Sequence, residues 1–417
     1  MNNLRWATCP LWSIVTESRE IVEPADLGDQ VLHYSIPAFD ATGAGQVEEA
    51  DSIKSAKLRL RGGEVLISKL NPRKSRVLMV PPSDGPMVSS TEFVGLRAVS
   101  SLEARFLTYW LQSEATRQAL DSQVQSVTRS HQRVAPEDIK RLSIDLPPVE
   151  EQRRIADFLD DETARIDRLV ALQKSLGVRL DDRDRTLRDG LVNGLADAAG
   201  EAPLRRFSTR IEQGASPQCE AVPRQDDSEW GVLKLSAVKG GRFEPMENKR
   251  LPPDVKPVSA HEVRPGDLLV TRANTPSLVG DVAVVAGSHQ RLLLPDLIYR
   301  VGLVPGVNAH FVAQVALSGR VRSLIESVAR GSSQSMVKLR GEDIKALPIP
   351  LATPDQQSAL VEQIRLGTDI TGRLRTTSAR QIALLAERRQ ALITAAVTGQ
   401  FDVTTASGRN VTDGVTA

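Results

Sequence analysis

Apolar residues in the middle of the chain recur at steps of three and four residues and their sum, which is the spacing of a coiled-coil seam. The seam comprises Ile155, Leu159, Ile166, Leu169, Leu176, Leu180 and Leu187. Pro147 and Pro148 precede it, and Glu150 and Glu151 suit the positive end of a helix dipole. The pattern predicts one helix over residues 150–197, which would be ~70 Å long at 1.5 Å per residue.

The same pattern returns near the end of the chain. This second helix has Leu360, Ile364, Leu374, Leu385 and Leu392 at the equivalent positions. Its middle is interrupted by Gly367, Thr371, Ser378 and Gln381, so we expect it to need a partner. Because a tandem repeat with approximate two-fold symmetry places equivalent helices head to tail, the two helices are predicted to pack as an antiparallel coiled coil.

The two helices belong to a longer internal repeat. Glu137-Asp138-Ile139-Lys140 recurs as Glu342-Asp343-Ile344-Lys345, an offset of 342 − 137 = 205. The match continues at this offset for about fifty residues and ends with Asp197 on Asp402. The chain is therefore predicted to be a duplication with pseudo-two-fold symmetry. A natural target for such a pair of units is equally bipartite, such as two half-sites on duplex DNA.

Each helical segment follows a segment of short apolar runs punctuated by Gly and Pro, which predicts a compact mixed domain. Residues 63–69 and 266–272 each read as a turn into a buried strand that ends in a cation. The predicted fold class is α+β, with two mixed α/β domains separated by two long helices. The predicted parts are a first globular domain (1–146), a central helical region (147–199), a second globular domain (200–350), a distal helical region (351–402) and a disordered tail (403–417).

The amino-acid composition argues against several classes of function. Lys+Arg 53 against Asp+Glu 52 leaves a net charge of +1, which argues against a binder that relies on bulk positive charge. A DNA-binding protein of this composition must read bases. Cys9 and Cys219 form no cluster with histidine at metal-ligand spacing, so we expect no metal site and a reduced cytosol. No apolar run approaches the ~18 residues of a membrane span, so the expected location is cytoplasmic, without a membrane partner.

Catalytic motifs are missing from the sequence. It contains no Gly-x4-Gly-Lys-Ser/Thr phosphate loop and no Asn-Pro-Pro-Tyr or Asp-Pro-Pro-Tyr run of an amino-methyltransferase. The two Glu-Asp-Ile-Lys tetrads could be the Asp-x-Lys arm of a metal-dependent nuclease. The opening turn of a short helix explains them better, since Pro136 and Gly341 precede them. We therefore predict no catalytic residue.

Candidate DNA contacts lie in two matched pairs of polar segments. The first pair follows the two matched strands and contains Lys69, Asn71, Arg73, Lys74 and Arg76 in one half, and Arg272 and Asn274 in the other. The second pair precedes the tetrads and contains Arg129, His131, Gln132 and Arg133, and then Gln334, Lys338 and Arg340. Cations seek the DNA backbone, whereas asparagine can pair with adenine. A solvated surface role is the alternative for each cation alone; recurrence in both halves favours DNA.

These features together resemble the specificity subunit of type I restriction-modification systems. Leu146-Pro147-Pro148-Val149-Glu150-Glu151-Gln152-Arg153-Arg154-Ile155 is similar to the opening of that family's conserved helical region, and residues 351–357 are a degraded second copy. Gly331-Ser332-Ser333-Gln334 resembles the family's loop before the helix, in which the glutamine and its neighbours face DNA. Thr128-Arg129-Ser130-His131-Gln132 departs from that pattern because it lacks the glycine.

The resemblance implies a non-catalytic subunit with two target-recognition domains, each reading one half of a split sequence in double-stranded DNA. It also implies that the helices hold the unread spacer and bind two methyltransferase subunits, which methylate adenine. Restriction/translocase subunits would convert the complex into a nuclease. S-adenosylmethionine, ATP and Mg²⁺ are then expected only in the partner subunits, with no cofactor in this chain.

Two other classes of protein fit parts of the pattern. A bipartite DNA-binding regulator would usually read with a compact helix-turn-helix and dimerise, whereas this chain already carries both halves. A coiled-coil interaction scaffold without DNA readout would explain the helices but not the recurrent cation-ended turns. Neighbouring reading frames for a methyltransferase and a large ATPase would separate these classes.

Overall fold

The computed structural model describes residues 6–124, 132–287, 289–333 and 336–403. The chain divides into two compact units. Unit 1 comprises Met1–Lys174 and Ala379–Ala417, and unit 2 comprises Ser175–Ser378. Two long helices, α5 (Val149–Ala199) and α9 (Pro354–Val397), contribute one half to each unit. Of the predicted tail, residues 404–417 lie outside the described residues.

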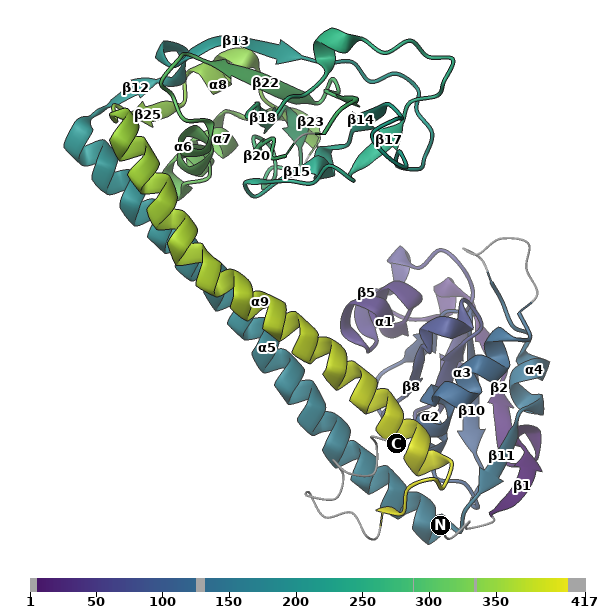
Figure 1. Ribbon diagram of the computed structural model, residues 1–417. Coiled ribbons are helices and arrows are strands. Elements are labelled where there is room, and N and C mark those ends of the chain that lie inside the picture. Colours follow the sequence, from purple (N-terminus) through teal and green to yellow (C-terminus); the bar gives the residue numbers. More distant parts are fainter. Residues whose placement is uncertain (1–5, 125–131, 288, 334–335, 404–417) are drawn as a thin grey trace. The chain divides into compact units, whose positions relative to one another are not determined.

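Unit 1 contains a globular domain built on two sheets (Figure 1). Its strands are β1 (Ala7–Pro10), β2 (Val15–Ser18), β3 (Ile21–Val22), β4 (Gln30–Tyr34), β5 (Gln46–Glu49), β6 (Lys57–Leu60), β7 (Val65–Ser68), β8 (Val77–Met79), β9 (Met87–Ser89), β10 (Phe93–Ala98) and β11 (Ser143–Leu146). Its shorter helices are α1 (Ile36–Thr42), α2 (Ala104–Gln112), α3 (Glu114–Asp121) and α4 (Pro136–Arg141). One sheet has the order β2-β10-β7-β8, the other has the order β3-β6-β9-β4-β5, and β1 pairs with β11.

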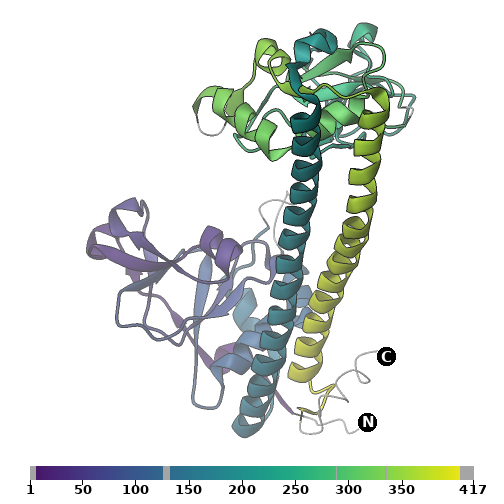
Figure 2. The same cartoon turned by 90° about the vertical axis from the view of Figure 1, so that its left-hand side faces the viewer.

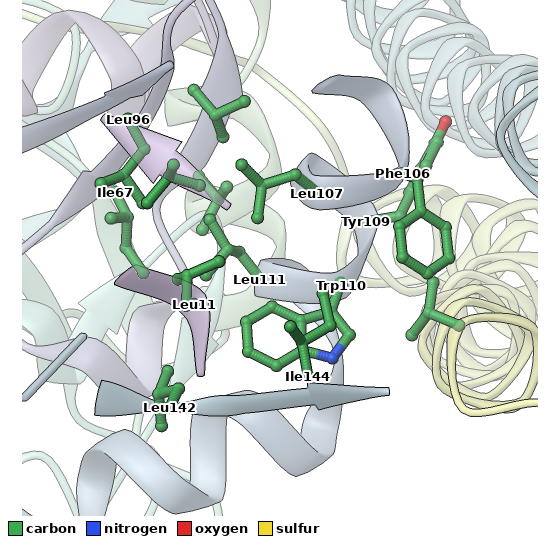
Figure 3. Close-up of a cluster of buried hydrophobic side chains, with 14 of the residues drawn as sticks. Leu11, Ile67, Leu96, Phe106, Leu107, Tyr109, Trp110, Leu111, Leu142 and Ile144 are labelled. Carbon is green, nitrogen blue, oxygen red and sulfur yellow. The ribbon is translucent and has the colours of Figure 1, made fainter. Parts of the chain in front are cut away.

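The core of unit 1 joins the sheet to the long helices. The amphipathic helix α2 buries Phe106, Leu107 and Leu111, which belong to one hydrophobic cluster with strand residues such as Ile67 and Ile144 (Figure 3). The same cluster takes in Ile155 and Leu159 of α5, and Ile393, Ala396 and Val397 of α9. Burying a large apolar side chain contributes roughly 1.5–3 kcal/mol, so this shared core attaches the domain to both helices.

Unit 2 repeats this plan. Its strands are β12 (Glu201–Pro203), β13 (Ser208–Gln213), β14 (Gly231–Leu233), β15 (Val238–Lys239), β16 (Arg242–Phe243), β17 (Asn248–Arg250), β18 (Leu268–Thr271), β19 (Ala273–Asn274), β20 (Val282–Val284), β21 (Leu292–Leu293), β22 (Ile298–Leu303), β23 (Arg330–Ser333), β24 (Met336–Lys338) and β25 (Pro348–Pro350). Its shorter helices are α6 (Ala309–Ala316), α7 (Gly319–Val328) and α8 (Gly341–Lys345). The sheet β13-β22-β18-β20 matches β2-β10-β7-β8 strand for strand, whereas β17-β14-β21 has no counterpart of the same order. The predicted internal repeat is confirmed: the four-stranded sheet is retained, and so is the pair β12-β25, which corresponds to β1-β11, whereas the remaining strands of unit 2 pair differently.

A buried glutamine fixes the start of each long helix. In unit 1, Gln152 Nε2 donates to the carbonyl of Pro147 at 2.8 Å, and its Oε1 accepts from the N–H of Glu103 at 2.7 Å. In unit 2, Gln357 Nε2 donates to the carbonyl of Ala352 at 2.9 Å, and its Oε1 accepts from the N–H of Asn308 at 2.8 Å. Each partner is displaced by the same 205 residues as the glutamines themselves.

The two long helices lie side by side and antiparallel in each unit, which confirms the predicted coiled coil (Figures 1 and 2). In unit 1, Ile166 of α5 packs with Leu392 of α9. In unit 2, a Cβ added to Gly367 of α9 would lie 2.2 Å from Leu187 Cδ2 of α5. The glycine therefore gives room to a leucine of the facing helix.

The predicted seam is buried along only part of its length. Ile155, Leu159, Ile166, Leu180, Leu360, Ile364 and Leu392 are buried, and Leu187 and Leu385 are half-buried. In contrast, Leu169, Leu176 and Leu374 are 43 %, 38 % and 45 % exposed, so the prediction that they lie in the seam is corrected.

For Leu176 and Leu374, which lie in unit 2, the physical reason is the composition of the facing helices. In unit 2 the seam accommodates Thr371, whose hydroxyl donates to Asp184 Oδ1 at 2.9 Å. Arg375 Nη2 completes this polar contact at 2.7 Å from Asp184 Oδ2. A buried carboxylate held by two donors takes space that a leucine pair would fill in a regular coiled coil.

Candidate nucleic-acid interface

In unit 1 the two predicted polar segments lie against each other. The N–H of Val134 donates to the carbonyl of Lys69 at 3.1 Å, and the N–H of Asn71 donates to the carbonyl of Gln132 at 2.7 Å. Leu70 and Arg133 form an isolated antiparallel bridge between these bonds. The turn after β7 and the segment before α4 therefore form one backbone-paired surface, although more than sixty positions separate them in sequence.

Unit 2 contains the same arrangement. The N–H of Leu339 donates to the carbonyl of Arg272 at 2.9 Å. Strand β19 then pairs with β24, with Ala273 opposite Lys338. Since 339 − 134 = 205 and 272 − 69 = 203, this bond is the counterpart of the one between Val134 and Lys69. The structure thus brings the two matched segments together in both units.

Side chains at the unit 1 surface differ in exposure. Arg73 and Lys74 are exposed, whereas Lys69, Asn71 and Gln132 are half-buried. Asn71 has a left-handed backbone, with φ of 52°, a conformation that asparagine tolerates better than most residues. Arg133 is 60 % exposed at its side chain and lies 2.8 Å from Glu92.

The prediction that Arg76 contacts DNA is corrected. Its side chain is only 4 % exposed and donates twice to Asp40, from Nε to Oδ1 at 2.6 Å and from Nη2 to Oδ2 at 2.7 Å. Its Nη1 donates to the carbonyl of Leu70 at 3.3 Å. The hydrogen bond from Arg76 lowers the pKa of Asp40 below its ordinary value. Arg76 therefore supports the turn from inside the domain.

At the unit 2 surface, Lys338 and Arg340 are exposed and Asn274 is half-buried. The Arg272 guanidinium lies 5.9 Å from the centre of the Tyr299 ring, and Nη1 donates to the carbonyl of Asp296 at 3.4 Å. At this distance the ring attracts the guanidinium by a cation–π interaction. Arg129, His131 and Gln334 lie outside the described residues.

Sequence reasoning missed the acidic partners of these surfaces. Asp40 and Glu92 hold Arg76 and Arg133, yet each acid lies 36 or 41 positions away in sequence from its arginine. No periodicity or motif marks such non-local pairs. The register between β10 and β7 brings Glu92 beside the turn, and that register is decided by the tertiary structure.

The Glu-Asp-Ile-Lys tetrads form the short helices α4 and α8, as the preferred interpretation predicted. Asp138 Oδ2 accepts from the N–H of Ala135 at 3.3 Å, and Asp343 Oδ2 accepts from the N–H of Arg340 at 2.8 Å. These aspartates cap helix ends. Across the described residues, no group of three or more His, Cys, Asp or Glu side chains is placed to hold a metal ion.

Parts of the chain are similar in sequence to known proteins. Residues 43–175 match the family model described as "Type I restriction modification DNA specificity domain". The chain is 30% identical over 155 residues to the type I restriction enzyme EcoEI specificity subunit of Escherichia coli, covering 37% of this chain and 26% of that protein. It is 22% identical over 282 residues to the EcoKI specificity subunit of Escherichia coli strain K12, covering 64% of this chain and 59% of that protein. Each match spans less than two thirds of the relative's own length.

The fold also matches a solved structure. The chain is similar to one described under "Structural basis underlying complex assembly and conformational transition of the type I R-M system", with a TM-score of 0.65, 18% identity, and coverage of 95% of this chain and 99% of that one. The resemblance to type I specificity subunits is confirmed. Among the described residues, no helix is long and apolar enough to cross a membrane.

Proposed function

We propose that this chain is the DNA sequence-specificity subunit of a type I restriction-modification complex. It binds a bipartite target in double-stranded DNA, one half-site for each unit, and it recruits methyltransferase and restriction/translocase subunits. It carries no catalysis of its own. S-adenosylmethionine, ATP and Mg²⁺ act in the partner subunits.

The observation that carries this proposal is the recurrence of one backbone-paired surface in both units. The bond from Val134 to Lys69 and the bond from Leu339 to Arg272 place a cation at the same point of two equivalent sheets. Around that point the side chains have diverged, as two surfaces that read different base sequences require. A single chain with two such surfaces needs no dimerisation to meet two half-sites.

Domain exchange tests the bipartite readout. Residues 1–146 would be replaced by the first recognition domain of another specificity subunit, and methylated adenines would be mapped genome-wide beside a strain without the gene. We expect one half of the methylated motif to change while the other half is retained. Simultaneous change of both halves would refute independent reading, and absence of any gene-dependent methylation would refute the function.

Partner binding is supported by the apolar residues that the helices leave exposed. In unit 1 these include Leu172, at 66 % exposed, and Leu384, at 53 %. In unit 2 they include Leu366 and Ile370, at 54 % and 62 %. Exposed apolar groups gathered on a helix surface favour burial against another protein.

The matched test compares two exposed apolar residues of unit 1. Leu172→Glu on α5 should abolish co-purification with the methyltransferase subunit, because a carboxylate is costly to bury in an interface. Val47→Glu on β5, where the residue is 67 % exposed, should leave co-purification unchanged. If both variants lost co-purification equally, or if neither lost it, the helices would not be the surface that recruits the methyltransferase subunit.

A further inference from the structure

Unit 2 contains a groove of about 1180 Å³ between its half of the long helices and the hairpin formed by β15 and β16. All of its lining residues lie within unit 2. Cations reach it from three segments: Arg185 and Arg188 from α5, Lys239 and Arg242 from the hairpin, and Arg373 from α9. The groove is somewhat larger than the ~300–1,000 Å³ of ordinary ligand pockets, so a small phosphorylated ligand fits within it.

The acids of the groove are mostly engaged. Asp181 and Asp184 bind Arg375 at 2.8 and 2.7 Å. Asp369 binds Arg365 at 3.0 Å. Glu244 is the remaining acid on the lining, so the carboxylates leave a positive excess.

Several of the cations are left without such compensation. In the part of the chain that the structure describes, Lys239, Arg242 and Arg373 are exposed and form no ion pair. Lys239 lies in the field of Asp281, a carboxyl whose Oδ2 accepts from the N–H of Gly240 at 2.8 Å. That bond holds the hairpin tip against the domain, so the position of the two hairpin cations is set by the core.

Among these cations, Arg188 has the largest desolvation cost. It is half-buried, its Nε donates to Gln314 Oε1 at 2.9 Å, and burial lowers the pKa of its guanidinium. Its counterpart in the repeat is Ile393, since 393 − 188 = 205, and Ile393 is fully buried in the core of unit 1. Arg185 likewise corresponds to Gln390. At these two positions unit 2 carries charge where unit 1 carries none, at a desolvation cost that an anionic ligand would offset.

We propose that this groove binds phosphate groups. Arg188 forms the floor of the site, and Lys239, Arg242 and Arg373 contact the ligand from two sides. Phosphate accepts several charge-assisted hydrogen bonds, which suits cations that converge from separate segments. The phosphate could belong to the DNA backbone, in which case the inference rests on the proposed function, or to a free polyphosphate such as a nucleotide, in which case it does not.

Two probes distinguish these sources: inorganic tripolyphosphate and a random-sequence DNA duplex, each titrated onto the full chain at several salt concentrations. Arg373→Gln and Lys239→Gln should each lower the affinity for one of the two probes roughly tenfold, which is the effect of removing one charged hydrogen bond. For the duplex, the slope of log K against log salt should fall by about 0.9 for each phosphate that the variant no longer neutralises. The matched control is Arg168→Gln, because Arg168 is the exposed counterpart of Arg373 in unit 1.

Weaker tripolyphosphate binding identifies a free-polyphosphate site, and weaker duplex binding with no tripolyphosphate binding identifies a DNA-backbone site. The proposal is overturned when neither variant differs from Arg168→Gln with either probe. Arg188→Met serves as the second variant, with thermal unfolding as the check on folding; binding unchanged in a folded Arg188→Met protein also overturns it. Because this assay measures affinity and the domain exchange reads the methylated motif, failure of one leaves the other standing.

Discussion

Asp189 of α5 accepts a hydrogen bond from the backbone N–H of Gly319 at 2.7 Å, which satisfies a free donor at the first turn of α7. In unit 1 the N–H of Glu114, at the first turn of α3, donates to Thr394 Oγ1 of α9 at 3.0 Å. Both partners are displaced by 205 residues, since 319 − 114 = 394 − 189 = 205. In unit 2, α5, which precedes the globular domain in sequence, makes this contact. In unit 1 the equivalent contact comes from α9, which follows the globular domain in sequence.

Removing this cap should loosen α7. We expect Asp189→Ala to lower the free energy of unfolding of unit 2 by about 1 kcal/mol, the usual cost of removing a helix cap. Amide hydrogen exchange across α7 measures the change. Asp182→Ala is the control on the same helix, because the Asp182 side chain is 62% exposed and its Oδ1 lies 3.4 Å from Arg185 Nη1 of the same helix. Equal protection of α7 in both variants would mean that the Asp189 bond contributes nothing.

Two glycines of α9 should respond oppositely to alanine. Gly372→Ala should stabilise unit 2 by about 0.5–1 kcal/mol, because a Cβ there meets nothing within 4 Å and alanine favours a helix. Gly367→Ala should lose that gain, since its Cβ would lie 2.2 Å from Leu187 Cδ2 and overpacking costs roughly 1–3 kcal/mol. Chemical denaturation gives both values. A Leu187→Ala background should remove the difference, and a difference that persists there would assign it to another cause.

Unit 1 should lose stability in strong base. Burial, together with donation from the Tyr109 hydroxyl to Asp160 Oδ1 at 2.7 Å, raises the pKa of Tyr109 to about 12. Unfolded tyrosine ionises near pH ~10, so unfolding releases a proton between the two values. The contribution is complete below pH ~10, falls as pH rises toward ~12, and can reach about 2–3 kcal/mol.

The Tyr109→Phe variant isolates this effect. It should be less stable than the parent at neutral pH by about 1 kcal/mol, because the hydrogen bond to Asp160 is removed. Its stability should then approach and overtake that of the parent between pH ~10 and ~12, because phenylalanine has no proton to release on unfolding. Parallel pH profiles for the two proteins would contradict the assignment.

Substitutions of Lys74 and Arg76 should have different effects, one on DNA affinity and the other on the stability of unit 1. Lys74→Ala should weaken binding to a random-sequence duplex and lower the salt slope by about 0.9, with little change in unfolding, because Lys74 is exposed. Arg76→Ala should instead destabilise unit 1 by roughly 1–3 kcal/mol, since it removes the buried partner of Asp40. Denaturation and salt-dependent titration of both variants provide the measurements, and a stable Arg76→Ala protein with reduced affinity would restore Arg76 to the interface.

The amino-acid sequence by itself determined the features that are local or that recur. The repeat offset predicted equivalent strands, the heptad spacing predicted two long helices, and Pro136 and Gly341 predicted short helices at the tetrads. These conclusions depend on backbone preferences and on periodic burial, which neighbouring residues encode.

Tertiary structure alone decided which polar side chains face outward and which are used inside. Arg76 and Lys74 are both cations of the same turn, and Lys74 is exposed. Arg76 is instead buried, and its guanidinium binds the carboxylate of Asp40, 36 positions away in sequence. Leu169 kept the heptad spacing, yet it is exposed, whereas Thr371 broke the spacing and is buried on Asp184. A buried charge or hydroxyl is stable only with its partner present, and that partner comes from a distant part of the chain, so periodicity cannot reveal it.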